Sequence, residues 1–393
     1  MPSAPLVSGM TAARGDTDIG TVRRILMTAD AVGGVWQYAL ELASGFCRNG
    51  GEVRLAVMGP APTEEQAHAA ISISGLSFVH GDFRLEWMQD AEADLARAGD
   101  WLLAQAHDFR PDLVHLNGYA HAALPWERPV LVVAHSCVLS WWRAVHGCAA
   151  PEEWDAYRAR VQAGLDAADL VIAPTRAFLD TIRSIYSFEA PSCVIWNGRS
   201  SAPRTPIDKK KVVMSAGRLW DAAKSVSALA KAAGALDAPV WVAGEDKAGA
   251  GGSDALVRLG RLGQREMQQR LSEAMIFALP ARYEPFGLTA VEAGQARCAL
   301  VLGNIATQRE LWDGAALFVH PDDTAGLIGT LRRLLAEPAL ADSLGARAQS
   351  RARRFEARRM VDSYQGAYEA MLLAPPRTSP TIAAMPFAGI HSQ

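Results

Sequence analysis

Residues 23–59 read RRILMTADAVGGVWQYALELASGFCRNGGEVRLAVMG, and this run alone specifies a strand, a helix and a second strand. The apolar run at residues 23–30 is typical of a strand, and AVGGV at 31–35 is typical of a turn. Residues 36–50 have the periodicity of a helix, and EVRLAVMG at 52–59 returns as a strand. This order predicts a βαβ unit with its two strands parallel.

The same alternation continues along the chain, with further apolar strands expected at residues 111–117, 129–136 and 169–175. It restarts at residue 211, and strands are expected at residues 211–218, 239–245, 255–261, 275–281, 298–304 and 316–321. Continuous rather than alternating apolar runs favour parallel sheets that are covered by helices on both faces. The sequence therefore predicts an α/β fold of two Rossmann-like, doubly wound domains facing a central cleft, although neither half contains G-x-G-x-x-G.

The domain limits follow from changes in composition. We expect a flexible tail at residues 1–22, a first domain at 23–197, a Pro- and Ser-rich linker at 198–208, a second domain at 209–355 and another flexible tail at 374–393. A last helix, at residues 356–373, has an apolar stripe that can bury against another element. The stripe consists of Met360, Val361, Tyr364, Tyr368 and Met371.

Composition excludes several classes of protein. The chain has 393 residues, 39 Lys and Arg against 42 Asp and Glu, and a net charge of −3, which argues against a nucleic-acid partner. Its five cysteines contain no C-x-x-C pair, so neither a disulfide framework nor a structural zinc site is expected. Without a signal peptide or a transmembrane run, we expect a cytoplasmic protein, and Arg-rich residues 351–359 leave room for peripheral contact with the inner membrane face.

The segment richest in chemistry is ARYEPFGLTAVE, residues 281–292. Pro285 and Gly287 interrupt any helix, so Glu284 should lie in a loop, while Glu292 falls about one turn into the helix that follows. The N–H groups of Gly287, Leu288 and Thr289 would then form a helix N-terminus that suits a phosphate. Carboxylates accept hydrogen bonds from hydroxyls, so one Glu on each side of a phosphate pocket predicts a nucleoside-diphosphate sugar.

Two cations lie near the end of the first strand of the second domain. Arg218 follows Ser215-Ala216-Gly217, and Lys224 comes near the start of the next helix. Both side chains could neutralise a diphosphate as it leaves. The alternative is that they are two solvated surface cations.

In the first domain, Gly33-Gly34 after the first strand would let the backbone approach a ligand closely, although a simple tight turn also explains it. His135 ends a strand and either hydrogen-bonds the transferred sugar or is a satisfied core histidine. Trp141 and Trp142 either stack on an acceptor or pack in the core. Weaker candidates of the same kind are His115, Asn117 and Asn197.

No metal is expected. The clear Asp-x-Asp match, Asp16-Thr17-Asp18, lies in the expected N-terminal tail. Cationic side chains and a helix N-terminus can replace a metal at a diphosphate, so we predict metal independence and no other cofactor.

These motifs resemble the family 4 glycosyltransferases, which have the two-domain GT-B architecture. The resemblance covers about residues 23–373 and rests on the glycine loop, on Ser-Ala-Gly-Arg-Leu with Lys224, and on Glu-Pro-Phe-Gly-Leu-Thr-Ala-Val-Glu, which is the most specific. One departure is Ser225, where the family usually has glycine. The resemblance implies transfer with anomeric retention and without metal, the leaving phosphate helping to deprotonate the acceptor, and a final helix that crosses back onto the first domain.

The resemblance also implies roles for the matched residues. Arg218 and Lys224 would hold the donor diphosphate, Glu284 the sugar hydroxyls and Glu292 the ribose. Together with the candidates above, the expected catalytic set is Arg218, Lys224, Glu284 and His135, and the expected donor-binding set is Gly33, Gly34, Asn197, Phe286, Gly287, Leu288, Thr289 and Glu292.

The leading interpretation is a retaining hexosyltransferase that moves a sugar from a nucleotide-sugar donor to a hydroxyl of a glycan, a lipid-linked acceptor or a small molecule. A sugar-nucleotide epimerase or a phosphorylase on the same architecture, or a non-catalytic nucleotide-sugar sensor, are the alternatives. The sequence leaves the base open among UDP, GDP and ADP.

Overall fold

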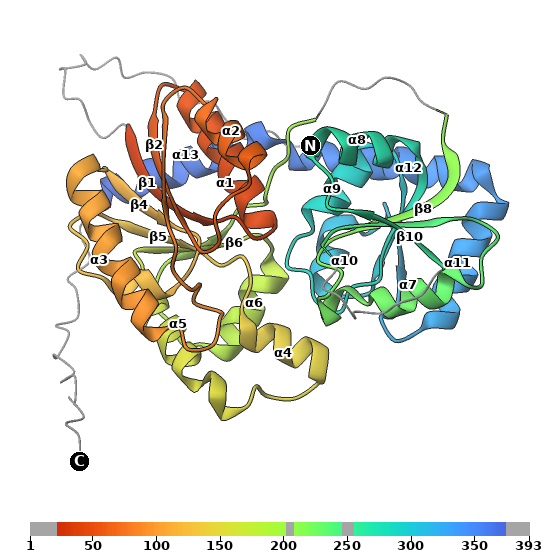
Figure 1. The fold of residues 1–393 in the computed structure, drawn as a ribbon, viewed down its shortest axis with the longest axis horizontal. Coiled ribbons are helices and arrows are strands. Elements are labelled where there is room, and N and C mark those ends of the chain that lie inside the picture. The colour runs from red at the N-terminus through yellow and green to blue at the C-terminus, as the bar shows by residue number, and fades with distance from the viewer. Residues whose placement is uncertain (1–21, 202–207, 246–254, 375–393) are drawn as a thin grey trace, which may run out of the picture.

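The computed structural model describes residues 22–201, 208–245 and 255–374, and it contains two α/β lobes side by side (Figure 1). The predicted tails therefore lie outside the described residues except for Val22 and Ala374, as does most of the predicted linker. Each lobe is built on one parallel sheet, of seven strands in the first and six in the second. This architecture confirms the predicted fold class.

The first sheet has the strand order β3-β2-β1-β4-β5-β6-β7. Its strands are β1 (Arg24–Asp30), β2 (Glu52–Met58), β3 (Leu76–Gly81), β4 (Leu113–Leu116), β5 (Val130–Val133), β6 (Leu170–Ala173) and β7 (Ser192–Val194). The helices are α1 (Gly34–Arg48), α2 (Glu64–Ile71), α3 (Glu92–Phe109), α4 (Val138–His146), α5 (Asp155–Ala167) and α6 (Arg176–Ile185), with short 3-10 turns η1 (Ala120–Ala123) and η2 (Glu152–Trp154).

The second sheet has the order β10-β9-β8-β11-β12-β13. Its strands are β8 (Lys210–Ala216), β9 (Val240–Ala243), β10 (Leu256–Gly260), β11 (Ala274–Leu279), β12 (Ala299–Gly303) and β13 (Leu317–Val319). The helices that follow β8 along the chain are α7 (Val226–Ala233), α8 (Gln264–Glu273), α9 (Leu288–Gln295), α10 (Ala306–Trp312), α11 (Thr324–Ala336), α12 (Pro338–Ala352) and α13 (Ala357–Leu373), with turns η3 (Ala222–Lys224) and η4 (Arg353–Phe355).

In both sheets the strand order reverses beside the first strand, because β1 lies between β2 and β4 and β8 lies between β9 and β11. Ligands of doubly wound sheets bind at such switch points, at the carboxyl ends of the strands. The turns after β1, β8 and β11 are therefore the places where chemistry is expected, and they carry the Gly33-Gly34, Arg218 and Glu284 segments.

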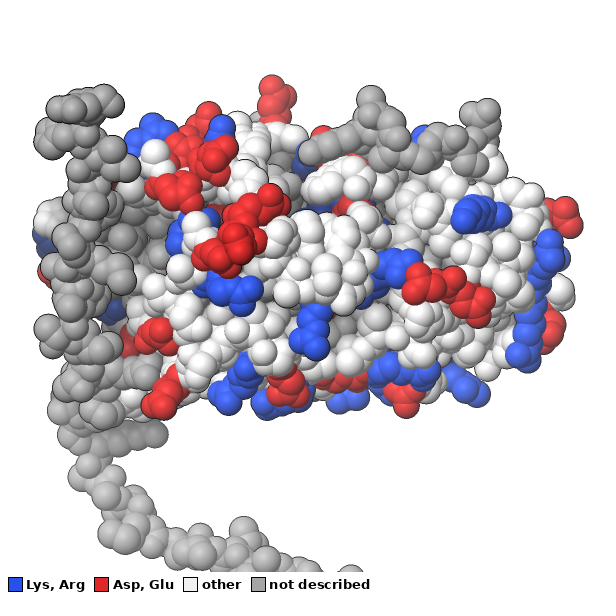
Figure 2. All heavy atoms as spheres, turned by 90° about the horizontal axis from the view of Figure 1, so that it is seen from below, with Lys and Arg blue, Asp and Glu red and all other residues white. Residues whose placement is uncertain are grey.

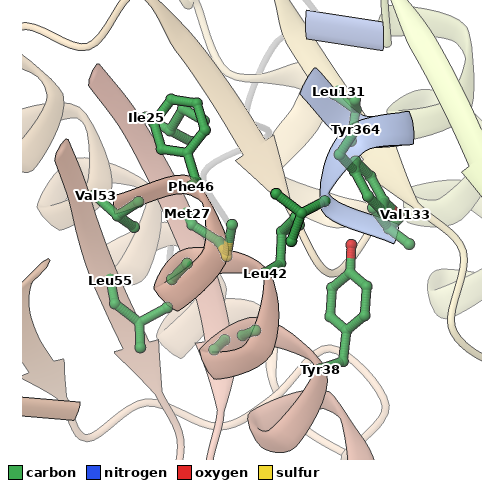
Figure 3. Packing of buried hydrophobic residues seen from close by; sticks show 14 of the residues in the cluster. Ile25, Met27, Tyr38, Leu42, Phe46, Val53, Leu55, Leu131, Val133 and Tyr364 are labelled. Carbon is green, nitrogen blue, oxygen red and sulfur yellow. The ribbon is translucent and has the colours of Figure 1, made fainter. Parts of the chain in front are cut away.

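Helix α13 packs on the first lobe rather than on the second. Its apolar stripe is buried with β1 and α1 in one core cluster, in which the hydroxyl of Tyr38 points toward Tyr364 (Figure 3). Before it, Arg199 N donates to Phe355 O at 2.9 Å, where the chain leaves the first sheet. The two lobes are thus tied together at both ends of the second domain.

Helix α1 begins at Gly34, two residues earlier than the sequence pattern suggests. The reason is Gly33, which caps the helix with a φ of 101°, a conformation that side chains rarely adopt. The loop thereby places the N-terminus of α1 at the edge of the cleft.

Candidate functional site

The loop after β11 is fixed by helix α10. The side-chain amide of Gln308 donates to Phe286 O at 2.9 Å, and Thr307 Oγ1 donates to Glu284 O at 2.7 Å. Gly287 has a φ of 91° and caps helix α9, which begins at Leu288. Glu284 therefore lies in the loop and Glu292 lies inside the helix, while the Phe286 side chain is buried in the core.

Glu284 faces Lys224 across the loop. Their Oε2 and Nζ atoms are 2.7 Å apart, and the side chains are only 15% and 12% exposed. The Lys224 side chain passes beside Gly217, where an added Cβ would lie 3.9 Å from its carbons. The structure thus brings two of the predicted catalytic side chains together.

Arg218 belongs to the same cluster through Asp221. Arg218 Nη2 lies 2.9 Å from Asp221 Oδ2, and the arginine side chain is 42% exposed, so its guanidinium can still reach a ligand. Trp141 Nε1 donates to Asp221 Oδ1 at 3.0 Å from the first lobe. Burial opposes ionisation of Asp221, but Arg218, Lys224 and the hydrogen bonds outweigh it and lower the pKa of this carboxyl.

The glycine loop of the first lobe meets this cluster. A Cβ added to Gly34 would lie 3.7 Å from Leu288 Cδ1, so the N-termini of α1 and α9 approach each other from opposite lobes. Neither helix has an acidic residue in its first turn. Two helix N-termini and the cations Arg218 and Lys224 make this place favourable for a diphosphate.

Glu292 has a partner that the sequence did not indicate. Its Oε1 lies 2.6 Å from Nε of Arg199, whose Nη1 lies 3.0 Å from Glu41 Oε1. The three side chains come from α9, the segment after β7, and α1, and each is at most 11% exposed. Asn197 lies in the same segment, 6% exposed, and its Oδ1 has no hydrogen-bond partner among the described residues.

His135 is held by a hydrogen-bond network. Asn117 Nδ2 donates to Thr28 O at 2.6 Å, which turns Asn117 Oδ1 toward His135 Nε2 at 2.8 Å. The imidazole therefore carries its proton on Nε2, and Nδ1 is left as an acceptor. Burial, with a smaller effect of His115, lowers the pKa of His135 to about 3, so the ring is neutral.

His115 is a core histidine. It is fully buried, its Nδ1 lies 2.8 Å from the Tyr368 hydroxyl, and its Nε2 lies 3.2 Å from Asn117 Oδ1. Burial lowers its pKa to about 3. Its partners are the hydroxyls of Tyr38 and Tyr368 and the amide oxygen of Asn117, all of them protein groups, so the structure favours the packing interpretation for this residue.

Further contacts that sequence reasoning missed join the lobes beside the cluster. The Tyr283 hydroxyl accepts from Cys137 N and lies 2.9 Å from Ser140 Oγ at the start of α4. The Glu310 carboxylate accepts from the N–H groups of Arg176 and Ala177 at the start of α6. Tyr283 lies partly buried in the loop after β11 and Glu310 lies partly buried in α10. Neither belongs to a sequence pattern that a single chain reveals, so nothing could have singled them out.

The surroundings of the site bear on a metal, on a membrane span and on the Arg-rich segment at residues 351–359. Within residues 22–201, 208–245 and 255–374, no three or more His, Cys, Asp or Glu side chains are grouped so that they could hold a metal ion. In the same part of the chain, no helix is both long and apolar enough to cross a bilayer. Basic and acidic side chains lie side by side on the face shown in Figure 2, and Arg351 binds the carbonyl oxygens of Leu311 and Asp313.

Two doubly wound lobes, each built on one parallel sheet, define the GT-B class of architecture. Family models agree with this. The model described as Glycosyltransferase Family 4 matches residues 32–201, and the one described as Glycosyl transferases group 1 matches residues 210–337. The chain belongs to the family 4 glycosyltransferases, as the sequence motifs predicted.

Solved structures show the same fold. Sucrose-phosphate synthase from Thermosynechococcus elongatus is 18% identical, with a TM-score of 0.74 over 90% of this chain and 100% of that one. HepE of Anabaena, solved in complex with UDP-glucose, is 16% identical, with a TM-score of 0.68 over 88% of this chain and 99% of that one.

A curated relative matches a shorter segment. Glycogen synthase of Mycobacterium tuberculosis is 37% identical over 95 residues, which are 24% of this chain and 23% of the relative. The chain therefore matches about a quarter of the length of that relative.

Proposed function

We propose that this glycosyltransferase moves a sugar from a nucleoside-diphosphate donor to a hydroxyl acceptor, with retention of the anomeric configuration and without a metal. The observation that carries the proposal is the meeting of two acid-free helix N-termini with the Arg218 and Lys224 cations in one place. Such a place stabilises the charge that develops on a departing diphosphate. Glu284, beside it, is an acceptor for sugar hydroxyls.

In the proposed reaction, one bond to the anomeric carbon breaks and another forms. The bond between the anomeric carbon and the phosphate oxygen breaks, and its electron pair stays on the diphosphate, which Arg218, Lys224 and the helix ends stabilise. The acceptor oxygen bonds to the same face of that carbon, and its proton passes to the leaving phosphate. Neutral His135, with Nδ1 free to accept, would hold a hydroxyl of the transferred sugar.

The first experiment identifies the donor. Thermal unfolding of the full chain is measured with UDP, GDP and ADP, because a ligand that binds only the folded state raises the melting temperature. The UDP-glucose complex of HepE and the segment shared with a glycogen synthase make nucleoside-diphosphate glucoses the first donors to test. No shift with any of the three nucleotides contradicts the proposal.

The second experiment tests the chemistry. Incubation with donor alone should leave the sugar configuration unchanged, whereas an epimerase would convert it without an acceptor. With an acceptor, the anomeric configuration of the product is read by NMR, and inversion contradicts the proposed retention. Transfer should persist in EDTA, and a strict requirement for Mg²⁺ or Mn²⁺ would show that the diphosphate site needs a metal.

A further inference from the structure

A cavity of about 60 Å³ opens in the first lobe, at the carboxyl ends of β1, β2 and β4. A water molecule needs roughly 10 to 15 Å³ of such volume, so the cavity has room for about four waters, or for one edge of a sugar ring. Asp30, Glu86 and Asn117 supply its polar groups, and Trp87 stands at its rim with 36% of its surface exposed. The sequence patterns singled out neither carboxylate.

The two carboxylates are preorganised to accept hydrogen bonds. Asp30 Oδ1 accepts from Val32 N at 2.7 Å, and its Oδ2 has no hydrogen bond from the described residues. Glu86 Oε2 accepts from Tyr119 N at 2.9 Å and Ala120 N at 2.8 Å, which leaves Oε1 near Gly118. Each acid is fixed through one oxygen and presents the other.

No cation among the lining residues balances these acids inside the cavity. Arg84 turns its guanidinium toward the following loop, where it donates to Gln89 O at 2.9 Å and lies 3.9 Å from Asp90. His121 is buried against Leu95 O, and burial lowers its pKa, so the ring is neutral. Arg218 and Arg160 act on Asp30 and Glu86 from outside the lining residues. A phosphate or carboxylate ligand would therefore meet two carboxylates with no cation among the lining residues to bind it.

Asp30 connects the cavity to the diphosphate site. Asp30 ends β1 just before the glycine loop, whose Gly34 approaches Leu288 at the N-terminus of α9. The Arg218 guanidinium also acts electrostatically on the Asp30 carboxyl. A ligand in the cavity can thus present a hydroxyl past Asp30 toward the reacting carbon. Its opposite face would stack on the exposed Trp87 ring.

We infer that the cavity binds the acceptor, and that the acceptor is an uncharged carbohydrate held through its hydroxyls by Asp30 and Glu86. The inference rests on the proposed function and narrows it, because it excludes sugar phosphates and sugar acids as preferred acceptors. Carboxylates accept well from hydroxyls, and an indole face suits the apolar face of a sugar ring.

The test measures sugar binding without a donor. Saturation-transfer NMR on the full chain is run with D-glucose, D-galactose and maltose, and in competition with glucose 6-phosphate and glucuronate. We expect at least one neutral sugar to bind, and the two anionic sugars to bind at least tenfold more weakly. Binding of no neutral sugar, or equal binding of an anionic one, overturns the inference.

Three variants locate the site. Asp30→Asn and Glu86→Gln keep an oxygen for the backbone N–H groups, and Trp87→Ala alters only the exposed rim, so the melting temperature reports whether each remains folded. Each should weaken neutral-sugar binding by about tenfold, whereas Asp108→Asn, which removes an acid paired with Arg54 elsewhere on this lobe, should not. Unchanged binding in the folded variants overturns the inference.

The nucleotide thermal shift separates the two proposals. If the protein binds nucleotide but no neutral sugar, the proposed function stands and the inference about the acceptor is wrong. If the protein binds neutral sugar through Asp30 and Glu86 but no nucleotide, the sugar site stands and the proposed function is wrong.

Discussion

The Lys224 ammonium lies 2.7 Å from Glu284 Oε2, so the side chain predicted to bind the diphosphate and the side chain predicted to bind the sugar form an ion pair. Both side chains are largely buried, and a charge in such surroundings needs a partner. When the donor binds, Lys224 would pair with the donor diphosphate, and the Glu284 carboxylate would accept hydrogen bonds from hydroxyls of the sugar. The pair therefore gives each of these buried charges a partner within the protein.

Replacing Glu284 with Gln should separate catalysis from folding. The amide keeps a carbonyl oxygen, but it loses the charge that holds Lys224 and the strong acceptor for sugar hydroxyls. We expect turnover to fall by about 100-fold, in line with the loss of one preorganised polar contact. Steady-state kinetics and nucleotide affinity are measured together. Turnover within a factor of three of the wild type would remove Glu284 from the mechanism.

Arg218→Ala should have a similar effect on turnover with little effect on stability. The side chain is 42% exposed and pairs with Asp221, so its removal costs little folding energy. Loss of one charge contact to the leaving diphosphate should lower turnover by about 100-fold or more. The matched control is Lys231→Ala on α7, an exposed cation, which should retain wild-type kinetics. Near-normal activity of Arg218→Ala would contradict its assignment.

The fold could be predicted because its determinants are local. Apolar runs of four to seven residues mark most of the strands, and glycines at 33 and 287 stand where the backbone needs a positive φ. Exceptions are β7, only Ser192–Val194, and β3, whose residues are only partly buried. Neither has the continuous apolar run that marks the central strands.

The partners within the site could not be predicted, because they are distant in sequence. Arg199 reaches Glu292 from 93 residues away, and Trp141 reaches Asp221 from 80 residues away. Spacing along the chain contains no record of these contacts, which depend on how the two lobes meet. Motif reasoning thus selected Lys224 and Glu284 as candidate functional residues but did not predict that they pair.

Arg199 should be a major determinant of stability. Its guanidinium is 5% exposed between Glu41 and Glu292, and Arg199→Met would leave two carboxylates facing each other without a cation. Removing one member of a buried ionic network typically costs about 3 to 5 kcal/mol. Urea unfolding should show this loss, while Arg333→Ala, which breaks an exposed pair with Glu337, should cost less than about 1 kcal/mol.

The same network offers an internal check. Combining Arg199→Met with Glu41→Gln and Glu292→Gln removes the stranded charges, so the triple variant should be more stable than Arg199→Met alone. A triple variant less stable than Arg199→Met would show that packing of the arginine stem, not its charge, supports this contact.

Ser225→Gly should stabilise the protein. Ser225 follows Lys224 with a φ of 52°, the left-handed conformation, and its hydroxyl is buried without a partner among the described residues. Glycine relieves the conformational cost and removes the unpaired hydroxyl, and the greater freedom of the unfolded chain offsets part of the gain. We expect a net gain of about 1 kcal/mol in thermal unfolding. A loss of stability would mean that the Ser225 hydroxyl has a structural role.

Asp30→Asn should make the protein more stable at neutral pH, although it should weaken sugar binding. Burial raises the pKa of Asp30 from 3.8 to about 6, against the opposing effects of the Val32 N–H and Arg218. The folded state therefore binds this proton more tightly than the unfolded state, so the carboxyl contributes a stability that is present below pH 4 and is lost as the pH rises through 6. A shift of about two pKa units corresponds to about 3 kcal/mol.

The expected signature is a difference that depends on pH. Urea unfolding of Asp30→Asn and the wild type should give similar free energies at pH 4, and the variant should be more stable by up to about 3 kcal/mol at pH 7. Taking the difference cancels the titrating groups that do not interact with Asp30, such as His115, but it does not cancel Glu86, whose pKa the Asp30 carboxylate raises. A constant difference from pH 4 to 7 would show that Asp30 titrates at its ordinary pKa. In that case the Asp30 carboxylate would cost no folding stability at neutral pH, and no function would be needed to account for it. A loss of stability that appears only when Asp30 is ionised is instead what we expect of a buried group that is retained to bind a ligand.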